Sequence, residues 1–240
     1  MVRRLAVLAC GFVFAAATPA LAQMQWTDKG FVNLSGGLQI GTSDVTSTQT
    51  FDLYGETATL VSAQDVKGGF LFDGHAGLRL RRNLAVGIGV SFVQSKADAG
   101  ITGSIPDPIR FDANRSTSAT ASDLAHSETW VAGLVTWVMP VTDRIDIFFS
   151  GGPAFVQIQQ EIPTGATITE PAPTLTNAVV TKFSKGGIGF VVGADVRYMI
   201  TSRIGLGALA KFAAASVNLT DEAKVEAGGF QLGGGVRVRF

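Results

Sequence analysis

The last thirteen residues of the chain, Gly228–Phe240, have the sequence GGFQLGGGVRVRF. Apolar side chains recur at every second position, at Phe230, Leu232, Val236, Val238 and Phe240. The residues between them are polar, basic or glycine: Gln231, Gly233, Gly235, Arg237 and Arg239. Because successive residues of a β-strand point to opposite sides, this stretch predicts a strand with one apolar and one polar face. The last residues of a soluble protein usually fray into water, so an apolar, aromatic-ended strand is unusual there.

The same alternation recurs in seven earlier segments, so the sequence predicts eight strands. The earlier segments are 31–40, 70–80, 84–92, 129–139, 145–155, 188–198 and 204–212. Long connections, at about 42–67, 94–127, 159–184 and 218–227, alternate with short turns. After residue 22, no run approaches the ~20 apolar residues of a membrane helix, so any membrane crossing must be made by strands. The predicted fold is therefore an all-β, eight-stranded antiparallel up-and-down transmembrane β-barrel, with the long connections as extracellular loops.

A soluble barrel of the lipocalin kind also alternates, with its apolar face turned inward. Aromatic residues favour the membrane barrel, because they gather at the strand ends where a bilayer has its two interfaces. At the loop ends these are Phe70, Phe72, Phe92, Phe155, Phe190, Phe212 and Phe230, and at the turn ends Phe31, Tyr198 and Phe240. The facing of strand 129–139 stays open, since Val131, Val135 and Trp137 compete with Trp130, Leu134 and Val138 for the outer face.

The closing strand, with Phe240 preceded by Val238 and Val236, resembles the carboxy-terminal assembly signal of bacterial outer-membrane proteins. The whole chain after residue 22 is similar to the eight-stranded outer-membrane β-barrel family that includes OmpA-like, OmpX-like and opacity-type proteins. This resemblance implies insertion into the outer membrane by the barrel assembly machinery and contact with outer-membrane lipid. The even number of strands places both termini on the periplasmic side, and the surface loops are expected to meet envelope or host partners.

The segment Met1–Ala22 reads as a cleaved secretory signal peptide. Arg3 and Arg4 precede an apolar core, and the small residues Ala20 and Ala22 mark a cleavage site before Gln23. The barrel domain is then 23–240. Val7–Cys10 loosely matches a lipoprotein signal, but cleavage there would leave almost no apolar core.

Charge and cysteine content exclude several classes of function. Removing Arg3 and Arg4 from the 19 basic residues leaves 17 against 19 acidic ones, a net charge of −2, so nucleic acid is not an expected partner. The single cysteine, Cys10, lies in the signal segment, and no disulfide, cysteine-based metal site or cofactor is expected. His75 has only His126 as a companion, which makes a metal site unlikely.

Charged residues on the polar faces of the strands are predicted to point into one narrow lumen. They are Asp73, His75, Arg79, Asp146, Asp195, Arg197, Lys211, Arg237 and Arg239. An eight-stranded barrel is filled by its own side chains, and a buried charge is costly unless it is paired. We therefore expect a plug of ion pairs, in which Asp195 is held by at least one of Arg79, Arg197 and Arg237, in preference to a gated ion path.

No convincing catalytic set is present. Ala125–Glu128 contains the residue types of a lipid-deacylating triad, but adjacent His126 and Ser127 side chains point to opposite faces of a strand. The sequence therefore favours a non-enzymatic outer-membrane protein whose closed barrel anchors long surface loops. The alternatives are an outer-membrane lipid-modifying enzyme of the deacylase or acyltransferase type, and a small channel or carrier for hydrophobic solutes.

Overall fold

The computed structural model describes residues 25–170, 172–218 and 224–240, with ten β-strands and no helix among them. The strands are β1 (Gly30–Ile40), β2 (Thr42–Leu53), β3 (Glu56–Lys67), β4 (Phe70–Arg81), β5 (Leu84–Pro106), β6 (Asn114–Pro140), β7 (Ile145–Thr169), β8 (Thr174–Met199), β9 (Ile204–Asn218) and β10 (Lys224–Arg239). No helix in these residues is long and apolar enough to cross a membrane.

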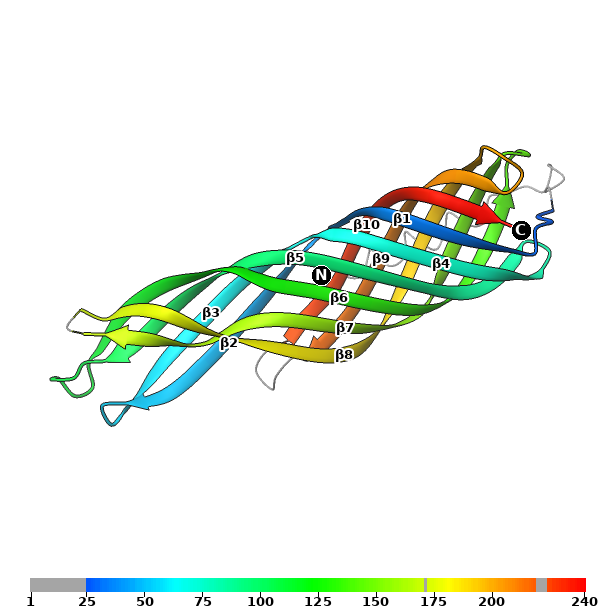
Figure 1. Ribbon diagram of the computed structural model, residues 1–240. Coiled ribbons are helices and arrows are strands. Elements are labelled where there is room, and N and C mark those ends of the chain that lie inside the picture. The colour runs from blue at the N-terminus through cyan, green and yellow to red at the C-terminus, as the bar shows by residue number, and fades with distance from the viewer. Residues whose placement is uncertain (1–24, 171, 219–223) are drawn as a thin grey trace, which may run out of the picture.

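All pairings are antiparallel, in the order β2-β3-β5-β4-β1-β10-β9-β8-β7-β6, and an additional pairing joins β5 to β6. Through that pairing, β1 and β4–β10 each have a partner on both sides. Figure 1 shows these strands wrapped around a common long axis, with β10 beside β1. The predicted all-β antiparallel architecture is confirmed.

The number of strands differs from the predicted eight because segment 42–67 forms a hairpin, β2–β3, where a loop was expected. Its strands alternate threonine with other polar or apolar residues, as in TSTQTFD (46–52) and ETATLVS (56–62). The contrast between the two faces is weak, so the hydrophobic pattern does not stand out. Threonine nevertheless has a high strand propensity because of its branched Cβ.

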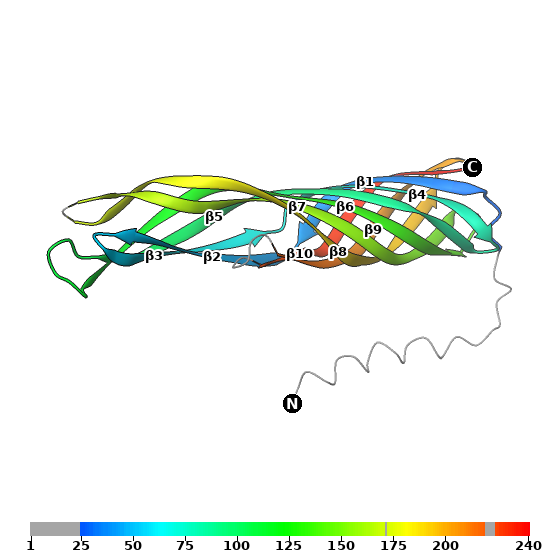
Figure 2. The same ribbon diagram turned by 90° about the horizontal axis from the view of Figure 1, so that it is seen from below.

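The segments 94–127 and 159–184, also expected as loops, are mostly strand. β5, β6, β7 and β8 have 23, 27, 25 and 26 residues, whereas β4 has 12. Together with β2 and β3 they continue past the other strands at one end of the molecule, as Figures 1 and 2 show. We call this part, formed by 42–67 and by the distal parts of β5–β8 (95–125, 161–170 and 172–182), the extension. Of the fourth expected loop, 218–227, residues 219–223 lie outside the described residues, whereas residue 218 ends β9 and residues 224–227 begin β10.

The extension consists of two layers. Beyond His126, β6 pairs with β5 and not with β7, so β2, β3, β5 and β6 form one sheet and the β7–β8 hairpin forms another. Apolar side chains from both layers pack between them: Leu60, Ala99, Ile101, Ile105, Ala121, Leu124 and Leu175. A buried core of this kind makes the extension a folded element, which explains why these segments are ordered strands.

The facing of strand 129–139 is decided by the fold. Val131, Val135 and Trp137 are exposed on the outer surface, and Trp130, Leu134 and Val138 are buried inside. Trp130 and Leu134 join an apolar cluster with Ala132, Ala154, Val156, Val191 and Ala213, whereas Val138 belongs to a separate cluster at the turn end. Both faces of this strand are therefore apolar, which is why alternation alone could not predict which face points outward.

Candidate functional site

The outer surface of the strand ring carries a continuous set of exposed apolar side chains. Among them, Leu80 is 66% and Ile188 81% exposed. Phe70, Phe72, Phe92, Phe155, Phe190, Phe212 and Phe230 are exposed at the ends nearest the extension, and Trp137, Tyr198 and Phe240 at the opposite ends. Soluble monomers rarely expose apolar patches of this extent, whereas a band with two aromatic girdles matches the core and interfaces of a bilayer.

Inside the ring, Asp195 on β8 is bound by two arginines. Arg237 donates from Nε to Asp195 Oδ1 at 2.9 Å and from Nη2 to Oδ2 at 2.5 Å. Arg197 donates from Nε to Asp195 Oδ1 at 3.2 Å. Arg237 Nη1 also donates to the carbonyl oxygen of Leu34, 3.1 Å away. All three charged side chains are buried, and two cations share one carboxylate at this place.

A second buried group joins Lys211 on β9 to Asp73 on β4. Lys211 Nζ makes an ion pair with Asp73 Oδ2 and donates to Ser91 Oγ at 2.7 Å. Ser91 in turn donates to Asp73 Oδ2 at 2.8 Å. These contacts cross the interior from non-adjacent strands, so they fill the ring as well as neutralising its charges.

The remaining predicted interior residues lie toward the turns. Arg239 is 3.5 Å from Asp146 Oδ2. Arg79 donates to the carbonyl oxygen of Trp26 at 2.7 Å and is not among the residues that hold Asp195. His75 packs edge-on against Phe31, with ring centroids 4.8 Å apart. Seven of the nine expected lumen residues thus contact a buried charge or a main-chain oxygen, whereas Asp146 lies near the partly buried Arg239 and His75 contacts an aromatic ring.

An aromatic layer at the turn end of the interior was missed by the sequence reasoning. Phe31, expected on the outer face, is only 1% exposed and packs with Trp26, Phe148, Ala85 and Val138. The Arg197 guanidinium carbon lies 3.1 Å from the centroid of the Phe148 ring and 4.6 Å from that of Phe31. Phe31 was misplaced because its aromatic ring was assigned to the interface girdle, although Phe31 is in phase with Asn33 and Ser35 on the polar face of β1.

The opposite end of the interior is closed by a buried polar layer around Glu128. Its Oε2 accepts a hydrogen bond from Trp130 Nε1 at 2.8 Å, and its Oε1 is 3.1 Å from His126 Nε2. His126 Nδ1 contacts Gln160 Oε1. Both ring nitrogens of His126 are therefore occupied within the layer, and the ring is 3% exposed. This arrangement does not present His126 as a base for Ser127.

Glutamines complete this layer, which the sequence reasoning also missed. Gln231 Nε2 donates to Gln39 Oε1 at 2.6 Å, and Gln160 Nε2 donates to Gln64 Oε1 at 2.9 Å. All four glutamines are buried. The available sequence signal was a glutamine or glutamate on the polar face at the loop end of several strands.

Next to this layer, the first part of β10, 224–229, is not paired with β1 in the wall of the ring. We call this place the seam. Within the described residues, β10 pairs with β9 from Lys224 but with β1 only from Phe230. Gly228 and Gly229, at φ +102° and +137°, adopt backbone conformations that favour glycine. The Gly228 amide donates to Glu128 Oε1 at 3.2 Å. Two outer-surface grooves, of about 410 and 420 Å³, adjoin the seam and share Gly41.

At the far end of the extension, the three hairpin tips are tied together by Glu170. Arg115 binds it with both terminal nitrogens, at 2.9 and 2.6 Å, and the Tyr54 hydroxyl donates to it at 3.3 Å. The Arg115 hydrogen bond holds the pKa of the Glu170 carboxyl below its usual range. The Asp107 carboxylate accepts hydrogen bonds from the backbone amides of Ile109 and Arg110, and these bonds lower the pKa of Asp107.

The residues of the expected assembly signal lie where β10 meets β1. Val236 pairs with Leu34 and Val238 with Val32. The Phe240 carbonyl oxygen accepts hydrogen bonds from the amides of Lys29 and Gly30, at 2.6 and 3.0 Å. The Phe240 ring is 54% exposed on the outer surface. The expected cleavage residues, Ala22 and Gln23, lie outside the described part of the chain.

Among solved structures, the similarity to one outer-membrane protein supports the same fold. The outer membrane protease OmpT from Escherichia coli superposes with a TM-score of 0.52 at 9% identity, covering 93% of this chain and 100% of OmpT. OprG from Pseudomonas aeruginosa gives a TM-score of 0.39 at 11% identity, covering 89% of this chain and 96% of OprG. Neisserial surface protein A gives 0.39 at 13% identity, covering 88% and 97%. No curated protein sequence matches the chain.

The profile of one protein family matches almost the entire chain, residues 6–240, and its description is "Outer membrane protein beta-barrel domain". This match agrees with the antiparallel strands, the exposed apolar band and the buried charges of the interior. The chain belongs to the outer-membrane β-barrel family.

Proposed function

We propose that this protein is a non-enzymatic integral outer-membrane protein, in which a closed eight-stranded barrel anchors the extension at the cell surface. β1 and β4–β10 are the barrel strands in this proposal. The length of the strands that form the extension supports this proposal. A transmembrane strand needs about 9–11 residues, and β6 has 27, so more than half of β6 serves a purpose beyond crossing the bilayer.

The interior supports a closed barrel. The charges Asp195 and Arg237 are buried and paired, and apolar side chains such as Leu134 and Val156 fill the space toward the extension. The Glu128 layer lies at that end. Ions would have to displace each of these groups to pass, so the protein is expected to be electrically silent in planar bilayers.

The chemistry near His126 argues against a lipid-modifying enzyme. A general base must reach the proton of its nucleophile, and both nitrogens of His126 contact Gln160 or Glu128. We expect purified protein to leave the acyl chains of outer-membrane lipids intact. Release of fatty acid by the purified protein, lost in a His126→Ala variant, would replace this proposal with the enzymatic one.

The proposed orientation places the extension outside and both termini in the periplasm, after removal of residues 1–22. It is tested with single cysteines, since the mature protein would have none of its own. Ile109 is 92% exposed at a tip of the extension, and Asp143 is exposed in the β6–β7 turn. A membrane-impermeant maleimide should label Ile109→Cys on intact cells, and Asp143→Cys only after permeabilisation. The reverse pattern would overturn the orientation, and retention of Cys10 in the mature protein would overturn the cleavage.

A carrier for hydrophobic solutes is a second candidate, favoured by the grooves at the seam. Ala214 lines the groove of about 410 Å³ together with Phe190 and Phe212. In this case, proteoliposomes should take up a hydrophobic fluorescent probe, and Ala214→Trp should block uptake by filling the groove. Ala208→Trp, on the same strand and exposed away from the groove, is the matched control. Equal uptake by liposomes without protein would dismiss this candidate.

A further inference from the structure

The outer face of the four-stranded sheet of the extension is a regular array of hydroxyl groups. Residues directly opposite each other in an antiparallel sheet point to the same side, so the register defines the rows. One row is Thr50–Thr59–Ser104–Ser116, the next is Thr48–Val61–Thr102–Ser118, and a third is Thr46–Ala63–Gly100–Thr120. Their neighbours in sequence, such as Leu60 and Ile101, are buried in the core. We call these twelve residues the hydroxyl face.

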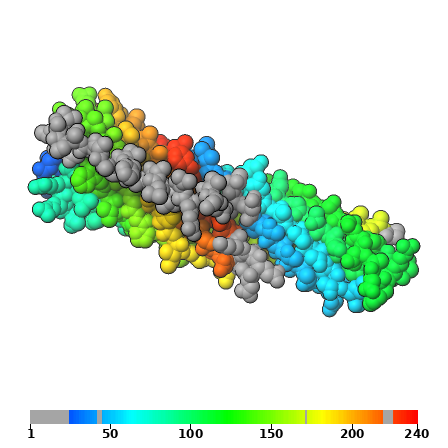
Figure 3. All heavy atoms as spheres, turned by 180° about the vertical axis from the view of Figure 1, so that it is seen from behind, coloured from blue at the N-terminus to red at the C-terminus, as the bar shows by residue number. Residues whose placement is uncertain are grey.

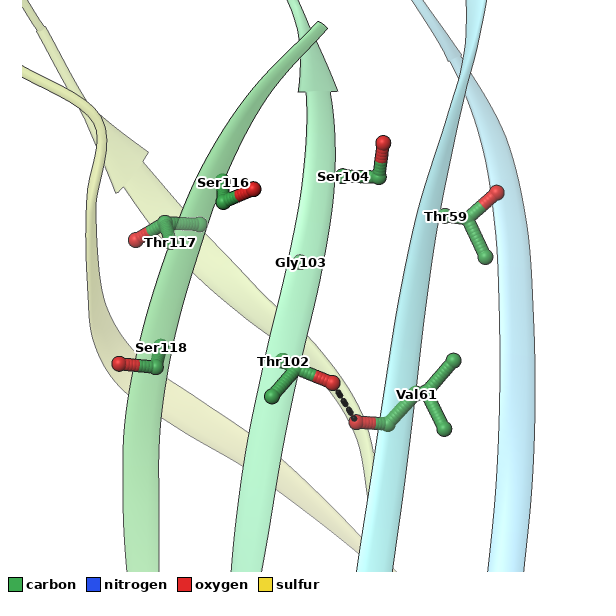
Figure 4. Close-up of a pocket in the computed structure, with 8 residues that line it drawn as sticks. All are labelled: Thr59, Val61, Thr102, Gly103, Ser104, Ser116, Thr117 and Ser118. Carbon is green, nitrogen blue, oxygen red and sulfur yellow. Dashed lines mark hydrogen bonds between the residues drawn. The ribbon is translucent and has the colours of Figure 1, made fainter.

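The middle of the hydroxyl face is hollowed. A shallow depression of about 470 Å³ is lined by Thr59, Val61, Thr102, Gly103, Ser104, Ser116, Thr117 and Ser118. Figure 4 shows these residues on three adjacent strands, with the hydroxyl groups of Thr59, Ser104 and Ser116 along one row. Thr102 Oγ1 donates to the carbonyl oxygen of Val61 at 3.4 Å, a long and therefore weak bond. Figure 3 shows the elongated body on which this sheet lies.

None of the twelve residues of the hydroxyl face is charged. The nearest charges on β2, β3 and β5 lie beyond the ends of the hydroxyl face: Asp52 and Glu56 toward the tips, and Asp65 and Asp98 toward the ring. A ligand for such a face is neutral and rich in hydroxyl groups, because serine and threonine hydroxyls both donate and accept hydrogen bonds. The threonine methyl groups and Val61 can pack against the C–H groups of a sugar ring. Since branched side chains on a sheet have few rotamers, little conformational entropy is lost on binding.

The position of the hydroxyl face indicates where such a ligand comes from. Along β5, Phe92 on the apolar band and Thr102 on the hydroxyl face point to the same side, ten residues apart. At ~3.3 Å per residue this distance is about 33 Å along the strand. The hydroxyl face therefore continues the lipid-facing surface outward, into the space that the sugar chains of surrounding outer-leaflet glycolipids occupy.

We propose that the hydroxyl face binds the neutral sugars of the lipopolysaccharide molecules that surround the barrel. This inference rests on the proposed function, because it requires the extension to lie on the cell surface. The extension is then held upright by the same lipid molecules whose acyl chains pack against the apolar band. The contact is made by the rows of hydroxyls on β3, β5 and β6, with Thr59, Thr102 and Ser104 at its centre.

The test uses the full mature protein in detergent and, as probe, the polysaccharide released from lipopolysaccharide by removal of lipid A. Calorimetric titration should detect binding to the parent protein. The variant Thr59→Val/Thr102→Val/Ser104→Ala keeps size and strand propensity but removes three hydroxyls. Losing three hydrogen bonds should weaken binding by about tenfold or more.

The matched control is Thr167→Val/Thr176→Val, which removes exposed hydroxyls from the β7–β8 hairpin of the other layer. Its affinity should stay within about twofold of the parent's, since such surface changes have small effects. Equal affinity of the triple variant and the parent overturns the inference, as does displacement of the polysaccharide by inorganic phosphate, which would indicate recognition of charge. Absence of binding to the parent overturns it too. The labelling of Ile109→Cys on intact cells is independent of all these outcomes, so failure of the sugar contact is distinguishable from failure of the proposed function.

Discussion

Arg237 on β10 reaches across β9 to bind Asp195 on β8, with its Nε 2.9 Å from Asp195 Oδ1. The two residues are on non-adjacent strands, and the guanidinium passes over Gly207 of the strand between them. A Cβ at Gly207 would lie 2.6 Å from Arg237 Nε. The ion pair therefore depends on a glycine that contributes no charge of its own.

Replacing Asp195 by alanine should destabilise the barrel strongly. The change leaves the buried guanidiniums of Arg197 and Arg237 without their carboxylate, and breaking a buried pair costs about 3–5 kcal/mol. The midpoint of thermal unfolding of the detergent-solubilised protein should fall, or the conductance in planar bilayers should rise. Asp52→Ala, at an exposed position of β2, is the control and should do neither. If Asp195→Ala has the parent's unfolding midpoint and shows no conductance, the ion pairs of Asp195 do not hold the barrel together.

Gly207→Ala should have a similar effect by steric means. The added methyl group collides with Arg237 Nε and, at 2.7 Å, with the carbonyl oxygen of Val196, so the guanidinium must leave Asp195 or the backbone must shift. We expect a loss of roughly 1–3 kcal/mol, as for other overpacked sites. Gly133→Ala meets nothing within 4 Å and should unfold at the parent's temperature. Equal melting of the two variants would contradict the proposed role of Gly207.

Replacing Phe240 by serine should reduce the amount of protein assembled in the outer membrane without blocking its export. The ring is exposed on the outer surface, and the substitution keeps the backbone hydrogen bonds to Lys29 and Gly30. Fractionation followed by heat-modifiable gel mobility measures the folded amount. The control Phe70→Ser, at an exposed position at the other end of the strands, should assemble more completely than Phe240→Ser. Normal abundance of folded Phe240→Ser would exclude an assembly role for the ring.

Acid should loosen the tips of the extension before it affects the barrel. The pKa of Glu170 is lowered by its hydrogen bond to Arg115, so the carboxylate contributes stability above its unfolded pKa of about 4.3. That contribution is lost as the pH falls through the lower folded-state pKa. Hydrogen exchange at the tips should therefore quicken as the pH falls from neutral to below about pH 4, after correction for the intrinsic rate. Arg115→Gln should exchange quickly already at neutral pH. A tip whose corrected exchange is unchanged by acid and by Arg115→Gln would show that Glu170 does not tie the hairpins.

The sequence alone was sufficient to predict an all-β antiparallel membrane protein. The reason is physical, because strands that face lipid on one side and a polar interior on the other must alternate with period two. The same alternation placed Asp195, Arg197 and Arg237 on interior faces, and charge pairing required that they meet.

Alternation could not determine the parts of the molecule in which both faces of a strand are alike. Trp130 and Val131 are both apolar, and only the packing of Trp130 in the interior cluster decides which of them is inside. In 42–67, threonine occupies much of the solvent face, and the core face mixes apolar residues with the buried polar residues Ser47, Ser62 and Gln64, so the segment lacks the contrast of a membrane strand. Its strand structure depends on pairing with β5 and on the shared core around Leu60 and Ile101.

Contacts between distant strands were decided by the tertiary structure alone. The two-residue periodicity of a strand predicts which face a side chain lies on. It does not predict which strand across the barrel carries the side chain that it contacts. Arg237 meets Asp195 because Gly207 leaves room between them, and Glu128 meets Gly228 because the seam leaves that amide without a strand partner on its side. The sequence determined the faces of the strands, whereas the closure of the sheet determined which side chains meet inside it, because only closure brings strands far apart in sequence to opposite sides of one narrow interior.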